Sequence, residues 1–298
     1  MQNRTSVRAK KILDLILFCL VATLMSFPVT RTRVHEWLGL ATTALALVHA
    51  SLNWRWFSRA FQGKYDARRS LLTLVNVLLL GVALYCALCG TSLSGYAVPF
   101  LNGILKPTLA RRSHIALAHW FLALVGIHAG LNYRALFSGI TRQRAWELAT
   151  TAAFFIVSCL GVYYFLVNRT PDYLFFKSHF AFLDSDAPKL LTLWRTVCVF
   201  IFWGFVGCQF HRALSSSDVK KRFAKAIPIL EIALVVATGA SLWALRARPN
   251  ENADGWSERC APQNVETTLV ESARVPSYFA STEFQPRSRR PNQNYYVS

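Results

Sequence analysis

The stretch that decides the fold is HEWLGLATTALALVHASLNW, residues 35–54, which is apolar enough to lie in a membrane yet has a histidine at each end of its apolar part. His35 and His49 are 14 residues apart. An α-helix turns 100° per residue, so the two imidazoles lie within about 40° of one helix face and roughly 21 Å apart along the axis. The hydrocarbon core of a bilayer is about 30 Å thick. In a membrane-spanning helix, one histidine therefore lies near each side of the membrane.

The same arrangement recurs 79 residues later, in HIALAHWFLALVGIHAGLNYR, residues 114–134. His114 and His128 are again 14 residues apart, and the two stretches share Leu, Ala, Asn and Arg residues in register. The repeat predicts a duplicated helical hairpin, in which the third and fourth helices repeat the first and second. The second and fourth helices then cross the membrane in the same direction, which sets His35 level with His114 and His49 level with His128.

The composition is typical of a membrane protein. Of the 298 residues, 53% are hydrophobic and only 16% are charged, whereas ordinary soluble domains have a charged fraction of about 25%. Several apolar runs approach the roughly 20 residues that a helix needs to cross the hydrocarbon core. We therefore predict an all-α, polytopic membrane bundle of about seven transmembrane helices, with the duplicated hairpin as its four-helix core. The runs are about 11–28, 36–54, 70–90, 113–133, 147–167, 190–210 and 226–246.

The net charge of +18 follows this topology and does not indicate a nucleic-acid surface. If the N-terminus is cytoplasmic, the inner segments contain 17 Lys and Arg residues and the outer loops, including one with Arg31 and Arg33, contain 8. The positive-inside rule expects such an excess in cytoplasmic loops. Seven crossings place the polar segment 249–298 outside, and its composition predicts disorder in the absence of a partner.

Each histidine level offers two imidazoles from opposite sides, which is the axial ligation that a six-coordinate haem iron needs. Ionisable side chains inside membrane spans are costly and usually functional. Zinc is less suitable, because its sites need three or four protein ligands close together. The alternative is that the four histidines are helix-end residues satisfied by hydrogen bonds.

The motifs HEWLG and HxxLNW at residues 35–54, followed by HxxxAxW and HxGLN at residues 114–132, resemble the bacterial flavinylation-associated cytochrome family. The resemblance covers about residues 9–137, and the histidine spacing is also similar to that of respiratory cytochrome b. It implies a four-helix b-type cytochrome of the bacterial inner membrane that serves transmembrane electron transfer. His119 stands where this family is expected to have an aromatic residue. Residues 238–241, TGAS, resemble a covalent flavin motif but lie inside an apolar run, so any flavin is expected on a partner.

The repeat also pairs neighbours that are candidates for binding the haem periphery. Asn53 and Asn132 follow His49 and His128 by four residues, and they either bind a propionate or cap the helix ends. Arg55 and Arg134 either pair with inner propionates or anchor the helices at the inner surface. Other candidates are Gly39, which would admit the flat porphyrin or relieve helix packing, and the outer arginines Arg31, Arg33, Arg111 and Arg112.

The remaining polar residues give weaker signals. His119 points about 140° away from His114 and is a poor ligand. Cys86 and Cys89 form a CxxC, but residue 90 is glycine where c-type haem attachment needs histidine, so we interpret them as small apolar helix residues. Charged residues inside the runs, Asp14 and Glu231, are expected to extend toward basic inner segments. His179 and His211 are expected at the surface or in polar contacts.

These patterns predict transmembrane electron transfer through two bis-histidine b-type haems, with a redox partner that is a flavoprotein, another protein or a quinone. The predicted divisions are a four-helix cytochrome domain (1–137), three further transmembrane helices (138–248) and the outer tail (249–298). One alternative is a non-redox transporter or assembly subunit with structural histidines, although the predicted spans have few buried charges and no visible midplane site of the kind that broken Gly/Pro-rich helices form. Another is an enzyme with its own quinol site, which Glu231 or His211 would have to supply.

Overall fold

The computed structural model describes residues 4–60, 62–63, 66–134, 144–178, 180–181, 184, 186–214 and 222–247. These residues form helices and connecting loops, with no strand among them, which confirms the all-α prediction. The chain divides into two units, Met1–Arg248 and Pro249–Ser298, and the predicted outer tail lies outside the described residues. The long helices are α1 (Arg4–Met25), α2 (Phe27–Leu52), α4 (Ala67–Ser92), α5 (Pro107–Leu131), α7 (Arg144–Val167), α9 (Lys189–Leu214) and α10 (Arg222–Ala247). The short ones are α3 (Trp54–Arg59), the 3₁₀ helix η1 (Pro99–Leu101) and α8 (Thr170–Leu174).

Several of these helices are long and apolar enough to cross a membrane. In the described part of the chain α4, α5, α9 and the segment Ala149–Val167 of α7 meet this condition singly, while α1 and α2 meet it together as a pair bent by 116°. Segment Pro228–Ala244 is a shorter apolar helix. Large aliphatic side chains of α4 face outward, such as Leu74 and Leu84 with 55% and 51% exposure. Such an apolar outer surface suits lipid, so the fold is that of a multi-pass helical membrane bundle.

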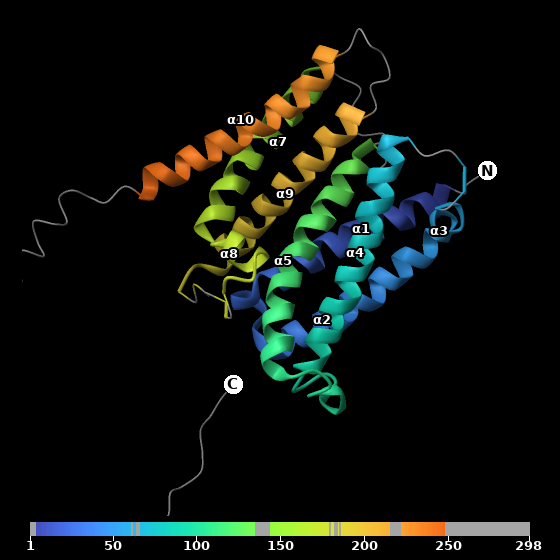
Figure 1. Cartoon of the computed structure of the whole chain (residues 1–298), viewed down its shortest axis with the longest axis vertical. Coiled ribbons are helices and arrows are strands. Elements are labelled where there is room, and N and C mark those ends of the chain that lie inside the picture. Colours follow the sequence, from blue (N-terminus) through green and yellow to red (C-terminus); the bar gives the residue numbers. More distant parts are fainter. Residues whose placement is uncertain are drawn as a thin grey trace, which may run out of the picture. The chain divides into compact units, whose positions relative to one another are not determined.

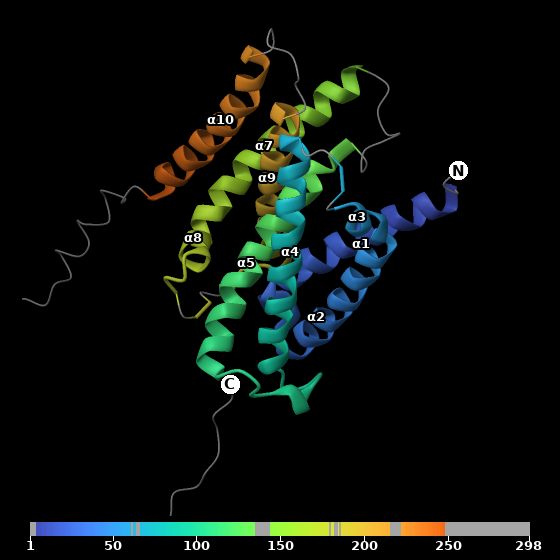
Figure 2. The ribbon, with the colours of Figure 1, turned by 45° about the vertical axis from the view of Figure 1, so that its right-hand side comes forward.

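The first four long helices form a closed ring (Figure 1, Figure 2). Around this ring α1 packs against α2, α2 against α4, α4 against α5, and α5 against α1. Helices α2 and α5 are therefore diagonal partners, as are α1 and α4. In the described residues α2 and α5 have little direct backbone contact. They therefore approach each other through their side chains.

The connection between α1 and α2 differs from the outer loop that the sequence predicts around residues 29–35. Ser26 alone links the two helices, and its buried hydroxyl donates to the Ala22 carbonyl and bonds the Thr196 hydroxyl of α9. Arg31 lies within α2 at a kink with φ +54°, and Arg33 follows in the same helix. The loop prediction was wrong because Ser26 turns the chain in one residue and Pro28 is compatible with the first turn of the next helix.

Helix α9 packs against the back of α5 through glycines. Gly126 and Gly130 lie one turn apart, and a Cβ atom at Gly126 would lie 2.6 Å from the Trp203 Cβ atom. A Cβ atom at Gly130 would collide with the Gly204 carbonyl oxygen and approach the Cys208 amide nitrogen to 2.7 Å. Such small-xxx-small pairs let transmembrane helices approach closely. His128 lies midway between the two glycines and so projects from the opposite face of α5.

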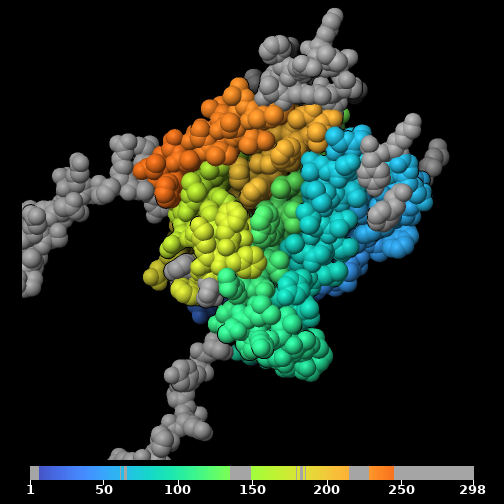
Figure 3. Space-filling view, viewed as in Figure 1, coloured from blue at the N-terminus to red at the C-terminus, as the bar shows by residue number. Residues whose placement is uncertain are grey.

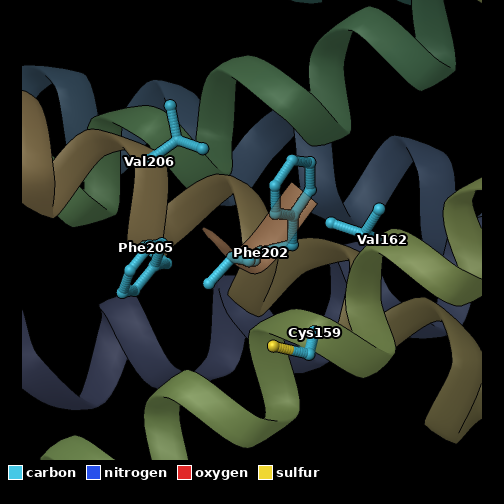
Figure 4. Packing of buried hydrophobic residues seen from close by; sticks show 6 residues of the cluster. Cys159, Val162, Phe202, Phe205 and Val206 are labelled. Carbon is cyan, nitrogen blue, oxygen red and sulfur yellow. The ribbon is translucent and has the colours of Figure 1, made fainter. Parts of the chain in front are cut away.

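Helices α7 and α10 extend the packing beyond α9. Cys159 and Val162 of α7 contact Phe202, Phe205 and Val206 of α9 in one buried cluster (Figure 4). Val235 of α10 belongs to the same cluster, and in the space-filling view α10 lies along α9 and the α7–α8 segment (Figure 3). The four-helix ring and the helices that follow it thus form one unit.

Candidate functional site

The four repeated histidines come together as two pairs between the diagonal helices α2 and α5. The ring centroids of His35 and His114 are 6.1 Å apart and their planes make an angle of 82°. Those of His49 and His128 are 6.4 Å apart, with an angle of 77°. Each pair therefore combines the histidines that occupy equivalent places in the two halves of the repeat.

The distance within each pair is suited to a metal ion between the rings. An imidazole nitrogen binds a first-row metal at about 2.0 Å and the ring centre lies about 1.2 Å behind it, so two axial imidazoles have centroids about 6.4 Å apart. Rings in plain edge-to-face contact have centroids about 4.5–7 Å apart. The observed distances fall within both ranges.

Three of the four histidines direct Nδ1 at an oxygen atom from the preceding helix in the chain. His49 Nδ1 lies 2.9 Å from Asp14 Oδ1 of α1, and His128 Nδ1 lies 2.7 Å from Asn76 Oδ1 of α4. His114 Nδ1 lies 3.0 Å from the backbone oxygen of Cys86 in α4. These oxygens accept a hydrogen bond from Nδ1–H, which leaves the lone pair of a neutral imidazole on Nε2. Histidines that bind a metal through Nε2 are usually held in this way.

His35 differs from the other three. Its Nδ1 is buried and has no hydrogen-bond partner, although the Leu24 backbone of α1 is close enough to interact with the ring. A buried polar atom without a partner costs about 1–3 kcal/mol. The Phe27 ring makes a T-shaped contact with the His35 ring, with the two ring centroids 5.2 Å apart.

Two glycines leave room around the His35–His114 pair. A Cβ atom at Gly39, one turn from His35, would meet nothing within 4 Å. A Cβ atom at Gly90 of α4 would lie 3.1 Å from the Cε1 atom of His114, so the absence of a side chain there admits the imidazole. The open space at Gly39 is compatible with a flat group beside the histidines.

Asn53 and Asn132 cap the helices that carry the histidines. Each lies at the C-terminal cap, and its side-chain amide donates at 2.9 Å to the carbonyl of His49 or His128, respectively. The Asn53 amide also lies 3.3 Å from His49 Nε2, a contact that a metal on this nitrogen would displace. In both halves of the repeat, the asparagine side chain therefore caps the end of its helix, which is one of the two roles expected from the sequence.

The arginine candidates lie at the ends of the helices. Arg55 of α3 and Arg134 are exposed, and the Arg134 guanidinium lies 3.3 Å from the Tyr133 hydroxyl. Arg33 lies over the Tyr96 ring at 5.0 Å from its centroid, and Arg112 donates to the Phe176 carbonyl at 3.0 Å. Arg31 and Arg111 are also exposed.

The other histidines occupy separate environments. His119 stacks on Tyr173 with centroids 4.6 Å apart, away from both pairs. His211 is 1% exposed and its Nδ1 donates to the Leu131 carbonyl at 2.8 Å, so it makes a buried polar contact and does not lie at the surface. His179 lies outside the described residues. Glu231 pairs with Arg212 at 2.7 Å.

Glu36, the second residue of the HEWLG motif, was not a candidate site residue; it fixes the end of α2 beside His35. Its carboxylate accepts hydrogen bonds from the Ser94 hydroxyl at 2.7 Å and from the backbone amides of Gly95, Tyr96 and Ala97 at 3.1, 2.8 and 2.9 Å. The carboxylate thus ties the loop after α4 to the helix that carries His35. The pattern of an acidic residue beside the first histidine and an SGYA loop was the only signal of this role in the sequence.

Replacing Glu36 with alanine should destabilise this end of the bundle. Four donors would lose a charged acceptor, and we expect a loss of about 2 kcal/mol, within the range for hydrogen bonds to charged groups. The thermal midpoint of the purified protein in detergent measures the effect. Glu36→Gln keeps one acceptor oxygen and should lose less, whereas equal midpoints for Glu36→Ala and the wild type would contradict this role.

Among the described residues, neither histidine pair has a third His, Cys, Asp or Glu side chain placed to complete a metal site. No group of three or more His, Cys, Asp or Glu side chains able to hold a metal ion occurs among the residues that the structure describes. Two axial imidazoles suffice only if the ligand brings its own equatorial donors, as a porphyrin does. No protein-family model, curated protein or solved structure gives a match to this chain.

Proposed function

We propose that the chain is a membrane b-type cytochrome that transfers electrons between the two sides of the membrane through two bis-histidine haems. His35 and His114 would hold one haem, and His49 and His128 would hold the other. The observation that carries this proposal is the pair of matched centroid distances, 6.1 and 6.4 Å, between diagonal helices. The resemblance of residues 9–137 to the flavinylation-associated cytochrome family agrees with it.

The residues of the chain have three tasks in this proposal. Haem, when bound, supplies the one-electron chemistry. The histidines of α2 and α5 hold it, and acceptors on α1 and α4 orient the rings through Nδ1. The apolar helices keep water away, which affects the redox potential. The glycine contact with α9 supports α5 from behind.

We further propose a topology of seven spans in a bacterial inner membrane, with a cytoplasmic N-terminus and an outer tail. The described residues contain seven long helices, of which four are singly long and apolar enough to span a membrane. These helices and the distribution of basic residues in the sequence support this arrangement. The redox partners would be a quinone or cytoplasmic carrier on one side and an extracytoplasmic protein, such as a flavoprotein, on the other. Membrane lipid surrounds the bundle.

Absorption spectra of the purified protein, oxidised and then reduced with dithionite, test the proposed cofactor. Protein produced with ample haem should show the bands of low-spin b-type haem, sharpened on reduction. If the histidines are only structural, as in a transporter or an assembly subunit, the spectrum has no haem bands. That second result would overturn the proposal.

A further inference from the structure

The oxygens that face the histidines follow the duplication of the hairpin. Asp14 and Leu24 lie 10 residues apart on α1, and Asn76 and Cys86 lie 10 residues apart on α4. Asp14 and Asn76 face the His49–His128 pair, while the backbones of Leu24 and Cys86 face the His35–His114 pair. Each helix that precedes a histidine helix therefore supplies polar groups that contact the histidines of that helix.

The acceptors differ in charge between the two pairs. The His35–His114 pair has only neutral groups at Nδ1: His114 faces the backbone oxygen and the thiol of Cys86, and His35 lacks a hydrogen bond there. The Glu36 carboxylate beside His35 accepts its hydrogen bonds from the loop after α4. The His49–His128 pair has one carboxylate, from Asp14, and one neutral amide, from Asn76. This difference is not visible in the histidine motifs, because the acceptors lie in other helices.

We propose that Asp14 and Asn76 are positioning residues that give the His49–His128 haem a lower reduction potential than the His35–His114 haem. The proposal rests on the haem function proposed above. A carboxylate that accepts a hydrogen bond from Nδ1–H makes the imidazole more basic and a stronger donor to the iron. A stronger donor stabilises the more positive, oxidised iron, so the potential falls. The neutral Asn76 oxygen has the same effect to a smaller extent, since hydrogen bonds to charged groups are the stronger ones.

The packing keeps Asp14 opposite His49. Lys10, one turn before Asp14, donates to the Leu52 carbonyl at 2.7 Å and to Asn53 Oδ1 at 3.2 Å. These bonds tie α1 to the C-terminal end of α2 in the register that aligns Asp14 with His49. Both side chains are about one-third exposed, at 29% for Asp14 and 31% for His49, so the pair lies at the edge of the bundle and not in its core.

Exchanging the two side chains tests the proposal. The variants are Asp14→Asn, Asn76→Asp and the double exchange, each in the full chain loaded with haem. An optical redox titration follows both haems. Asp14→Asn should raise the midpoint reduction potential of the His49–His128 haem, and Asn76→Asp should lower it. Each change should be at least tenfold in the redox equilibrium constant, which is about 59 mV for a one-electron step. The double exchange should return this potential close to the wild-type value. The midpoint potential of the His35–His114 haem should stay unchanged in all three variants.

Asp172→Asn is the matched control, because it removes a carboxylate that pairs with Arg169 at 2.9 Å and not with a histidine. It should leave both midpoints unchanged. If Asp14→Asn retains both haems at unchanged midpoints, or if the control shifts them equally, the assignment to Asp14 and Asn76 is overturned while the haem function stands. If the wild type binds no haem, the proposed function itself fails.

Discussion

Replacing His128 with alanine should remove one of the two haems and leave the other in place. His128 faces His49 across α2 and α5 with ring centroids 6.4 Å apart, and with alanine only one histidine would remain to hold the proposed haem. His49→Ala should therefore remove the same haem, identified by its spectrum and midpoint. The two effects should not add, because residues that act on one site are coupled. His35→Ala and His114→Ala should both remove the other haem.

His119→Ala is the matched control for these variants. His119 lies in the same helix as His114 and His128, but it stacks on Tyr173 and should leave the haem content unchanged. The haem-to-protein ratio of the purified variants is the measurement. Loss of different haems in His49→Ala and His128→Ala would show that the pairs are assigned wrongly.

Gly130→Ala should strongly destabilise the bundle, although it adds only one methyl group. The new Cβ atom would collide with the Gly204 carbonyl oxygen of α9, and a backbone atom cannot move aside as a side chain can. We expect a loss of about 3 kcal/mol in the free energy of unfolding, at the upper end of the range for overpacked cores. Both haems should bind more weakly, because α5 carries a ligand of each pair.

Gly81→Ala provides the control with the same chemical change. Gly81 lies inside α4 and is exposed, and a Cβ atom at this position would meet nothing within 4 Å. Replacing glycine with alanine in such a helix should stabilise it by up to about 1 kcal/mol. Chemical denaturation in detergent compares the two variants, and equal stabilities would contradict the close approach of α5 and α9.

The sequence predicts those features of the fold that depend on a single helix. The seven apolar runs each coincide with a long helix, because apolar length is a local property. The 14-residue spacing of His35 and His49 places both on one face by helix geometry alone. The pairing with His114 and His128 required only that the two repeated helices run in parallel.

The features that the sequence does not reveal depend on contacts between helices. The sequence predicts that Asp14 extends toward basic residues, whereas it bonds His49 of the next helix. The sequence indicates only that Cys86 is a small apolar residue. It gives no sign that the Cys86 backbone oxygen faces His114. The predicted loop around Arg31 is instead a kink within α2, because the turn depends on the bonds of Ser26 with Ala22 and Thr196. Partners such as Asp14 with His49 are distant in sequence and leave no periodic signal.

The most direct test of the central claim is the number of b-type haems bound per chain in the purified wild-type protein. We expect two haems, both low-spin, because each of the two histidine pairs would hold one. A ratio of one haem per chain, or of none in protein produced with ample haem, would contradict the central claim.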